Sequence, residues 1–408
     1  MNSNPTPTDS PNVGIFDDQF FSEPINRHNT NCFKWDVDKP ERDIIPLWVA
    51  DMDLHVAPKI TQALHERVGQ AIFGYTKVPQ SFYDAIVNWY DRRYQWKPQA
   101  SSILYTIGVV PAVAAIIKAL AKGEDVGVVM QTPAYNCFFS CIKNNGCHLL
   151  ENKLVPQGNS YVVDFDDFER QVSKPDAKIC LICSPHNPVG RIWTRDELKR
   201  MADICLKHNV TMVVDEIHSG VIMPGQTFTT FGSLGSEYVQ KNVITASPSK
   251  SFNTAGLQMA YIICHDADMR ASIDRAININ EVCDVNPFGV IALQVAYNEC
   301  EDWLNGLCRY VFGNYQALCQ YLADHMPWVR VADLQGTYLA WVDFRVTGLS
   351  SQQLADKLLL DAKVRVSPGC IYGESDGFLR INLACPRQQL LEGLRRMSQC
   401  LNPLVTNK

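Results

Sequence analysis

The sequence predicts an α/β fold, with a three-layer αβα large domain on a mostly parallel sheet and a smaller α+β domain. From about residue 102 to residue 264, continuous apolar runs alternate with helix-like segments, as in parallel sheets covered by helices on both faces. After about residue 300, a long helical pattern is followed by shorter strand-like runs. We therefore expect an N-terminal segment (1–60) that packs with the small domain, a large domain (61–300) and a small C-terminal domain (301–408).

The expected elements follow in chain order. The strand-like runs of the large domain are ILYTIG (103–108), DVGVVMQT (125–132), AKICLIC (177–183), NVTMVVD (209–215), NVITAS (242–247) and LQMAYIIC (257–264). A helix is expected over 109–123, with Pro111 in its first turn, and another over 194–209, where Thr194 and Glu197 can form a capping box. The small domain is expected to contain a helix over 303–326 and strands near 337–344, 364–369 and 377–384.

Composition narrows the class of protein. The chain has 408 residues, a net charge of -6, 46% hydrophobic and 20% charged residues, which is typical of a soluble globular protein. No basic run indicates nucleic-acid binding, and no apolar stretch is long enough to span a membrane. Residues 1–14 lack the features of a secretory signal and are expected to be a disordered leader.

The chain contains 15 cysteines, most of them in apolar segments. We expect buried free thiols and therefore a reducing, cytoplasmic location. Cys180 and Cys183 form a C-x-x-C pattern. Residues three apart on a strand point to opposite faces, so the pair is not expected to bind a metal, and no metal site is predicted.

Chemically distinctive residues follow the predicted strands. Gly108, the TPAY segment (132–135), Asn187, Asp215 and Lys250 each lie at or after the carboxyl end of one strand. In open α/β sheets, ligands bind beyond these strand ends. We therefore expect these residues to lie around one ligand site.

Three of these positions indicate the chemistry of the ligand. The helix start after Gly108 suits an anion such as phosphate, although an ordinary βα turn is the alternative. Asp215 ends a buried strand, where it either caps a helix, pairs with an arginine or faces a protonated ring nitrogen, while Glu216 is expected to point away and be structural. There is no P-loop and no dinucleotide fingerprint, so a nucleotide is not indicated.

Lys250 stands in the segment SPSKSFN, at a strand end in an apolar neighbourhood and without another charge beside it, although a solvated surface lysine is the usual default. Desolvation lowers the pKa of a lysine and frees its amine to react with carbonyl groups. Ser247 and Ser249 could hold a phosphate. Pyridoxal 5'-phosphate (PLP) accounts for all three features, because it needs a Schiff-base lysine, an acidic group at its ring nitrogen and a phosphate site.

The sequence resembles the MalY/PatB family of cystathionine β-lyases and related C–S lyases, which are PLP enzymes of the aspartate aminotransferase fold type. The resemblance extends from about Phe16 to the C-terminus. The motifs that carry it, in the family's order, are PLWVADMDL, FGYT, TPAY, CSPHNPVG, VVDEIHSG, SPSKSFN and FLRINLACPR.

The resemblance implies a role for each candidate catalytic residue. Lys250 would form the Schiff base and then act as general base, and Asp215 would keep the pyridine nitrogen protonated. Asn187 would donate to the ring hydroxyl oxygen, and Tyr135 would stack on the ring. His218 would lie near the same edge as Asp215, unless it is a satisfied core histidine.

The phosphate and substrate contacts are implied in the same way. Gly108, Val109, Ser247 and Ser249 would surround the phosphate. Tyr75, in FGYT, would reach the phosphate of the neighbouring subunit, which makes a homodimer the minimal active unit. Arg380 would bind the substrate carboxylate, with a structural salt bridge as the alternative.

Two departures from related folds concern the phosphate. The position eight residues after Lys250 often holds an arginine, and here it is Gln258. The loop TIGVVPA (106–112) is apolar where relatives commonly place a hydroxyl residue. Phosphate binding would then depend on backbone N–H groups, with a lower expected affinity for the cofactor.

The function that the resemblance implies is β-elimination of cystathionine or another S-substituted cysteine to a thiol, pyruvate and ammonia, as part of amino-acid metabolism. An aminotransferase on the same scaffold is the alternative enzyme. A regulatory binding protein on an old enzyme frame is the alternative from another class. The joint presence of Lys250, Asp215, Asn187 and Arg380 argues against that reading, because a binding protein needs none of them.

Overall fold

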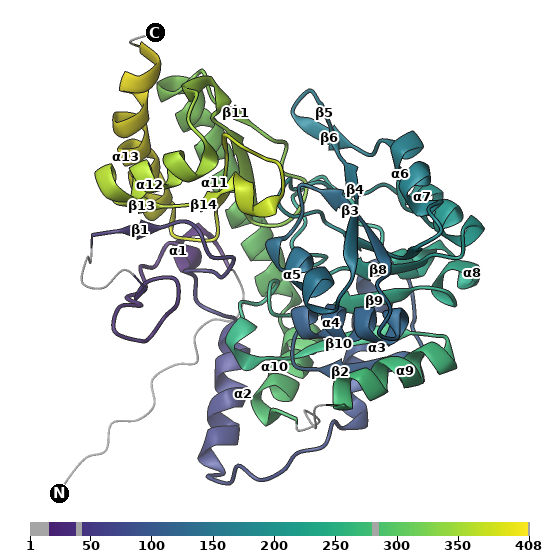
Figure 1. Ribbon diagram of the computed structural model, residues 1–408. Helices are drawn as coiled ribbons and strands as arrows, with labels where there is room; N and C mark the ends of the chain where they lie inside the picture. The colour runs from purple at the N-terminus through teal and green to yellow at the C-terminus, as the bar shows by residue number, and fades with distance from the viewer. Residues whose placement is uncertain (1–15, 38–42, 280–284, 407–408) are drawn as a thin grey trace, which may run out of the picture.

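A seven-stranded sheet lies at the centre of the chain, and the predicted α/β class is confirmed (Figure 1). The computed structural model describes residues 16–37, 43–279 and 285–406. The predicted disordered leader, 1–14, lies outside the described residues. The strand order is β2-β10-β9-β8-β7-β3-β4. The bounds are β2 Ile103–Thr106, β3 Gly127–Thr132, β4 His148–Lys153, β7 Ala177–Cys183, β8 Thr211–Asp215, β9 Val243–Ala246 and β10 Ala260–Cys264.

The sheet is mostly parallel, as predicted. Only β10 runs antiparallel to its two neighbours, β2 and β9. The strand β4 was not predicted, because its sequence HLLENK mixes apolar and polar residues at the edge of the sheet. The small hairpin of β5 (Val155–Gln157) and β6 (Ser160–Val162) was missed for the same reason.

Helices cover both faces of this sheet. One face packs against α4 (Val109–Ala121), α5 (Asn136–Asn144) and α9 (Ala267–Asn278). The other face packs against a second set: α2 Pro58–Gly69, α3 Gln80–Tyr94, α6 Phe165–Val172, α7 Arg195–Lys207 and α10 Pro287–Glu299. Each buried strand contributes alternate residues to the two layers, because successive side chains on a strand point to opposite faces.

Local signals in the sequence set the helix ends near the sheet. Pro111 lies in the first turn of α4, and the helix ends at Ala121, before Lys122 and Gly123, which both have positive φ. The predicted capping box of α7 is present, since Thr194 and Glu197 satisfy each other's backbone N–H groups.

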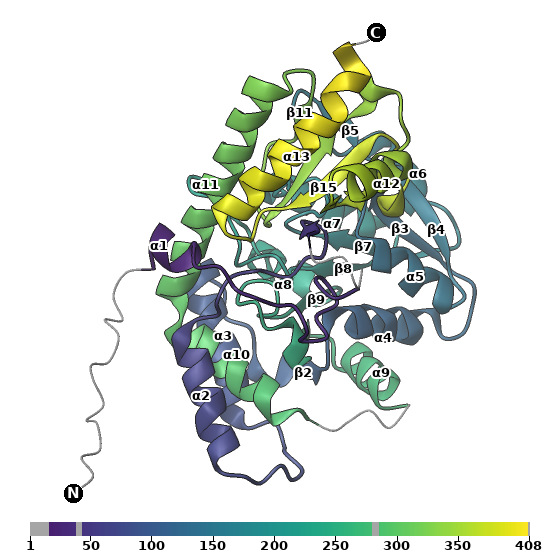
Figure 2. The same cartoon turned by 90° about the vertical axis from the view of Figure 1, so that its left-hand side faces the viewer.

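The C-terminal part of the chain contains a second, smaller sheet, as expected, with four antiparallel strands. Its order is β11-β12-β15-β14, with β11 Arg330–Val331, β12 Leu339–Asp343, β15 Phe378–Asn382 and β14 Ser367–Pro368. The helices α11 (Glu301–His325), α12 (Ser351–Asp361) and α13 (Arg387–Thr406) accompany it. Figure 2 shows α11 and α13 side by side beyond this sheet.

The N-terminal segment runs along the small sheet. Strand β1 (Ile45–Pro46) pairs in parallel with β13 (Val364–Arg365), and the Asp53 N–H donates to the Ala384 carbonyl at 2.8 Å. The remaining short helices are α1 Asp18–Phe21 and α8 Ser236–Val239, with single 3-10 turns at Ala100–Ser102, Phe231–Leu234, Ala255–Leu257, Arg345–Thr347 and Gly369–Tyr372. The predicted domain boundaries themselves stay a prediction.

The cysteines follow the sequence interpretation. All fourteen described cysteines are free. Cys180 and Cys183 pack in different apolar clusters on opposite faces of the sheet, as predicted. In the described part of the chain, no cluster of His, Cys, Asp and Glu can hold a metal, and no helix is long and apolar enough to cross a membrane.

Candidate active site

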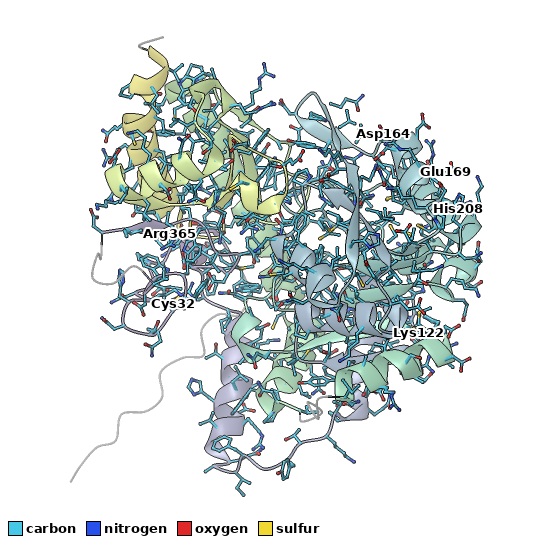
Figure 3. The ribbon with its side chains drawn as sticks, viewed as in Figure 1. Cys32, Lys122, Asp164, Glu169, His208 and Arg365 are labelled. Atoms are coloured by element: carbon cyan, nitrogen blue, oxygen red, sulfur yellow. The ribbon has the colours of Figure 1, made fainter. Side chains whose placement is uncertain are left out.

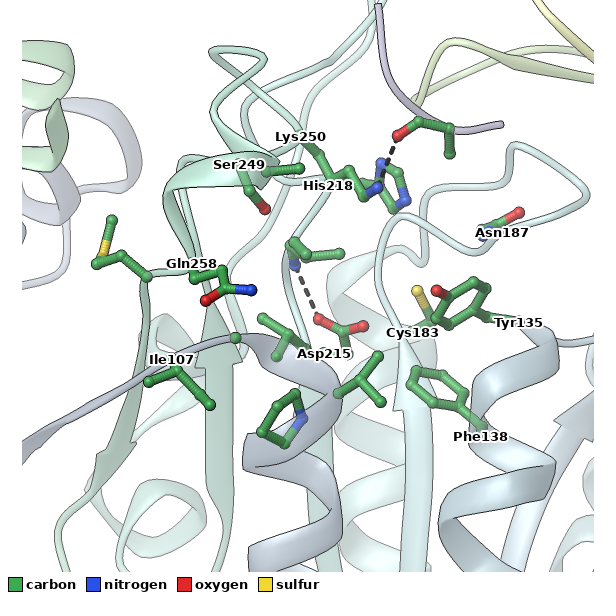
Figure 4. A pocket seen from close by; sticks show the side chains of 18 residues that line it. Ile107, Tyr135, Phe138, Cys183, Asn187, Asp215, His218, Ser249, Lys250 and Gln258 are labelled. Atoms are coloured by element: carbon green, nitrogen blue, oxygen red, sulfur yellow. Dashed lines mark hydrogen bonds between the residues drawn. The ribbon is translucent and has the colours of Figure 1, made fainter. Parts of the chain in front are cut away.

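The carboxyl ends of five strands meet at one edge of the central sheet. Strands β2, β3, β7, β8 and β9 run in the same direction, and antiparallel β10 begins where they end. The register places Cys183 opposite Asp215 and Asp215 opposite Thr245. Figure 4 shows the cavity that opens at this edge. The topology therefore brings together residues that are far apart in sequence: Lys250 and Ala50, which are 200 positions apart, line the same cavity.

Eight of the predicted site residues line this cavity: Gly108, Val109, Tyr135, Asn187, Asp215, His218, Ser249 and Lys250. The other lining residues are Ala50, Ile107, Val110, Pro111, Phe138, Cys183, Ile217, Ala255, Gln258 and Met259. Most of the second group are apolar. These apolar side chains surround a few polar groups and lower the local dielectric constant, which strengthens electrostatic interactions inside the cavity.

Lys250 reaches into the cavity from the loop after β9. Its Nζ atom donates a hydrogen bond to the Ala50 carbonyl at 2.6 Å (Figure 4). Burial, followed by the positive charge of Arg380, lowers the pKa of Lys250 from 10.5 to about 8. A substantial fraction of this lysine is therefore an uncharged amine near neutral pH, as its sequence neighbourhood predicted.

Asp215 lies at the floor of the cavity and is only 2% exposed. Its Oδ1 atom accepts the Ile217 N–H at 3.0 Å and lies 3.5 Å from the Thr245 hydroxyl. Burial raises the pKa of Asp215 from 3.8 to about 7, against the opposing effect of these two donors and of Lys250. A buried carboxyl with few donors is well placed to receive a cationic partner from the cavity.

Glu216 points to the other side of the sheet, as predicted. It accepts hydrogen bonds from the Thr230 hydroxyl, at 2.8 and 3.0 Å, and from the Phe231 N–H at 2.7 Å. The Tyr90 hydroxyl lies 3.4 Å from the same carboxyl. Glu216 is thus a satisfied structural residue, whereas the donors that reach its neighbour Asp215 both bind Oδ1.

Two buried polar atoms near the cavity have no hydrogen-bond partner among the described residues: Nδ1 of His218 and Nε of Arg380. The His218 side chain lines the cavity, and burial together with the charges of Lys250 and Arg380 lowers its pKa to about 3. His218 is therefore a neutral imidazole. Buried polar groups are nearly always paired, so the unpaired Nδ1 of His218 in the cavity wall suits a polar group of a ligand.

Arg380 does not line the cavity but lies directly behind Asn187. Its Nη1 donates to Asn187 Oδ1 at 3.2 Å, and its Nη2 donates to the Trp48 carbonyl at 3.0 Å. The guanidinium stands 4.9 Å from the ring centroid of Tyr372. No carboxylate pairs with Arg380 among the described residues, so the structural salt bridge considered above is not formed.

Tyr135 lies at the N-cap of α5, and its ring meets Phe138 edge to face with centroids 5.5 Å apart. Burial raises the pKa of the Tyr135 hydroxyl, which keeps it a neutral phenol. The ring is thus an uncharged aromatic surface on one wall of the cavity.

The N-terminus of α4 forms the opposite end of the cavity. Gly108 and Val109 present the first backbone N–H groups of the helix, and a Cβ at Gly108 would lie 3.3 Å from Cδ of Pro111. Gln258, in a left-handed backbone conformation, lies nearby in place of an arginine. Lys250 is the one cationic side chain among the described residues that line the cavity.

Besides Arg380, two other predicted residues, Ser247 and Tyr75, do not line the cavity. The Ser247 hydroxyl donates to the Met259 carbonyl at 2.6 Å and accepts the Ser249 N–H at 3.0 Å, so it stabilises the lysine loop and does not face the cavity. This geometry does not favour the predicted phosphate contact of Ser247. Tyr75 is 97% exposed in the connection between α2 and α3.

The sequence interpretation missed the Ala50 carbonyl and the side chains of Cys183 and Ile217. Cys183 ends β7 and Ile217 follows β8, so the strand-end rule alone would have found both. Ala50 belongs to the motif PLWVADMDL, but no residue type in that motif indicates that a backbone carbonyl meets Lys250.

The fold and the site define a PLP-type α/β enzyme scaffold, and the chain belongs to the aminotransferase class I and II family, whose profile matches residues 42–397. It is 37% identical to cystathionine β-lyase PatB of Bacillus subtilis, over 94% of this chain and 100% of PatB. It is 31% identical to the protein MalY of Escherichia coli, over 92% and 96%. The predicted resemblance to the MalY/PatB family is confirmed.

Solved structures agree with this assignment. Cystalysin from Treponema denticola, whose crystal structure contains a pyridoxal 5'-phosphate cofactor, is 32% identical, with a TM-score of 0.89 over 94% of this chain and 99% of cystalysin. The PLP-bound C–S lyase from Staphylococcus hominis is 29% identical, with a TM-score of 0.86 over 93% and 98%.

The electrostatics of the cavity predict how Lys250 titrates. In the full-length chain with no small molecule bound, acetic anhydride should label the Nζ atom of Lys250 with a midpoint near pH 8. The Asp215→Asn variant should move this midpoint to lower pH, because the Asp215 carboxylate raises the pKa of Lys250. The extent of labelling is measured by peptide mass spectrometry.

Asp343→Asn, which removes a carboxylate from the surface pair with Arg345, is the matched control and should leave the midpoint unchanged. An unchanged midpoint in Asp215→Asn would show that the two groups do not interact through the cavity.

Proposed function

We propose that this chain is a PLP-dependent carbon–sulfur lyase that cleaves cystathionine or a related S-substituted cysteine by β-elimination. The observation that carries the proposal is the convergence of Lys250, Asp215 and Asn187 on one cavity, in a chain of this family. The products would be a thiol, pyruvate and ammonia. With cystathionine, the thiol would be homocysteine.

The residues of the cavity fit PLP. The acidic Asp215 at the floor suits a protonated ring nitrogen, and the unpaired Nδ1 of His218 lies in the same wall. The free N–H groups at the start of α4 suit a phosphate, with Ser249 and Gln258 nearby. The flat ring of Tyr135 suits the face of an aromatic cofactor.

When bound, PLP supplies an aldehyde that condenses with amines and a ring that accepts the electrons left on Cα after its proton is removed. The chain would supply the rest. Lys250 would hold the cofactor covalently between turnovers, and Asp215 would keep the ring nitrogen protonated. Asn187 would donate to the ring hydroxyl oxygen, and Tyr135 would fix the plane of the ring.

Lys250 would also move the Cα proton. As a free amine, Nζ would be an efficient base near neutral pH, because burial lowers its pKa to about 8. Arg380 would hold the substrate carboxylate through its unpaired Nε and its Nη atoms. This anchor would orient the Cα–H bond toward Nζ of Lys250.

An aminotransferase remains the alternative within the family, because some relatives are named so and both reactions begin with the loss of the Cα proton. The similarity to PatB, which extends over the whole of that protein, favours the lyase. A purely regulatory role is disfavoured, because it would need no desolvated lysine opposite a buried carboxyl.

Lys250→Ala should abolish the reaction. With cystathionine and no keto acid, the native chain should release pyruvate and homocysteine in equal amounts, and the variant should lower the rate by at least roughly 10²-fold, since it lacks the general base. Pyruvate is measured with lactate dehydrogenase and the thiol with a chromogenic disulfide.

Lys207→Ala, at a surface lysine, is the control and should keep full activity. Product formation that requires a keto acid would identify an aminotransferase and contradict the lyase proposal.

Arg380→Lys should weaken substrate binding more than it slows the chemistry. An ammonium cannot reproduce the planar, bidentate fork of a guanidinium, so KM should rise by roughly 10- to 100-fold, with a smaller change in kcat. Steady-state kinetics with cystathionine measure both constants. Arg345→Lys, at an exposed ion pair, is the control. A loss of thermal stability with an unchanged KM would show that Arg380 is only structural.

We also propose that the active unit is a homodimer, located in the cytoplasm. The connection between α2 and α3 exposes Ile72, Phe73 and Tyr75 at 71%, 62% and 97% of their surface. Burial of such side chains against a second copy would stabilise a dimer. Tyr75 would then reach the phosphate of the partner.

The free thiols of the described residues support a reducing compartment.

The dimer proposal predicts a specific effect of Tyr75→Phe. The variant keeps the ring for the interface but loses the hydroxyl, so the affinity for PLP should fall by about 10-fold while the chain stays dimeric. Equilibrium dialysis measures the affinity, and light scattering measures the mass. Tyr321→Phe, which removes a hydroxyl bonded to Ser398, is the control. A monomeric native chain would contradict the proposal.

A further inference from the structure

Residues 47–54, here called the strap, run between the Lys250 loop and the small sheet, and Ala50 among them lines the cavity. The strap carbonyls at positions 48 to 52 and 54 all accept hydrogen bonds from side chains. The donors are Arg380 and Ser367 to Trp48, Asn382 to Val49 and Asp51, Lys250 and Tyr338 to Ala50, Lys34 to Asp51, Asn253 and Arg27 to Met52, and Asn253 to Leu54.

The strap is thus attached on two sides. On the side of the lysine loop, the Asn253 amide donates to the Met52 and Leu54 carbonyls at 3.1 Å and accepts the Met52 N–H at 3.0 Å. On the side of the small sheet, the Asn382 amide donates to the Val49 and Asp51 carbonyls at 2.6 Å. Ala50 lies between the two carbonyls that Asn382 binds.

A third attachment comes from the N-terminal segment, through Lys34. The side chain of Lys34 is 0% exposed. Its Nζ atom lies 2.8 Å from Oδ2 of Asp53 and 3.3 Å from the Asp51 carbonyl. The Lys34 carbonyl in turn accepts the indole N–H of Trp48 at 3.1 Å. Lys34 therefore contacts both ends of the strap.

The acceptor for Lys34 is itself rigidly held. The Asp53 carboxylate also accepts hydrogen bonds from Arg27 at 2.6 Å, Trp35 at 2.8 Å and Gln389 at 3.0 Å. A buried ion pair is costly unless its geometry is good and its remaining lone pairs are satisfied, and both conditions hold here. Figure 3 shows where this N-terminal segment lies. It labels Cys32, which is two residues before Lys34, and Arg365 of β13.

We propose that Lys34 is a positioning residue for Lys250, acting through the strap. Its ammonium fixes the Asp51 carbonyl and the Asp53 carboxylate, and so holds the adjacent Ala50 carbonyl 2.6 Å from Nζ of Lys250. Tyr338 donates to the same carbonyl at 2.9 Å and limits its rotation. The importance of this for catalysis rests on the proposed function of Lys250 as the reacting amine.

The titration of Lys250 distinguishes positioning from other effects of a change at Lys34. Arg380 on β15, Asp51 on the strap, Asp215 on β8 and Cys137 on α5 all act on the Lys250 charge, and His218 lies beside it. Loss of a positive charge at Lys34 by itself would raise the pKa of Lys250. Displacement of the Ala50 carbonyl and of Asp51 would lower it, because both favour the ammonium form.

The experiment compares Lys34→Met with the native chain by acetic anhydride labelling. The full-length proteins are first treated with hydroxylamine, so that Nζ of Lys250 carries no aldehyde. Lys34→Met keeps an unbranched side chain, one atom shorter than that of lysine, and removes its charge. The labelling midpoint of Lys250 should move to lower pH by roughly half a unit to one unit, the equivalent of one lost hydrogen bond.

Arg93→Met is the matched control, because it removes the cation of a partly buried pair, with Glu301, that joins α3 to α11. It should lower stability without moving the midpoint. Trp35→Phe removes one hydrogen bond to Asp53 with no change of charge and should give a smaller shift in the same direction. If Lys34→Met does not fold, Trp35→Phe decides the question.

A midpoint that is unchanged or higher in these variants would overturn the positioning role and leave Lys34 as a structural residue. The assay needs no cofactor, so the two proposals fail separately. A chain that binds no PLP but shows the downward shift would contradict the proposed function alone. A chain that binds PLP but shows no shift would contradict the positioning role alone.

Discussion

The burial of a lysine and a carboxyl at the same edge of a parallel sheet is the constraint on which the site depends. Parallel strands place their carboxyl ends together, so residues that follow different strands share one apolar cavity. Burial there lowers the pKa of Lys250 to about 8 and raises that of Asp215 to about 7. Burial disfavours the charged form of each group, so one cause shifts the two pKa values in opposite directions.

Much of this arrangement could be predicted from the sequence, because its signals are local. The apolar strands, the Pro111 start of α4 and the capping box of Thr194 and Glu197 appear where they were expected. The strand-end rule then placed Gly108, Asn187, Asp215 and Lys250 around one site without any knowledge of strand order. The opposite orientations of Glu216 and Asp215 followed from the two-residue period of a strand.

The rest depends on contacts that local patterns do not encode. The Ser247 hydroxyl does not face the cavity, because it donates to the Met259 carbonyl, just before β10, at 2.6 Å. The Ala50 carbonyl meets Lys250 in a strap that also accepts hydrogen bonds from Asn253, Asn382 and Lys34, which lie in three separate parts of the chain. Backbone acceptors carry no signature in the sequence, so such positioning contacts become visible only in three dimensions.

The most direct test of the account is borohydride reduction of the purified chain, followed by peptide mass spectrometry. If Lys250 binds the aldehyde of PLP, the protein absorbs visible light, loses that absorption on reduction, and yields a Lys250 peptide that carries a reduced phosphopyridoxyl group. A colourless protein that cannot be reconstituted with PLP, or a stable adduct at another lysine, would contradict the central claim.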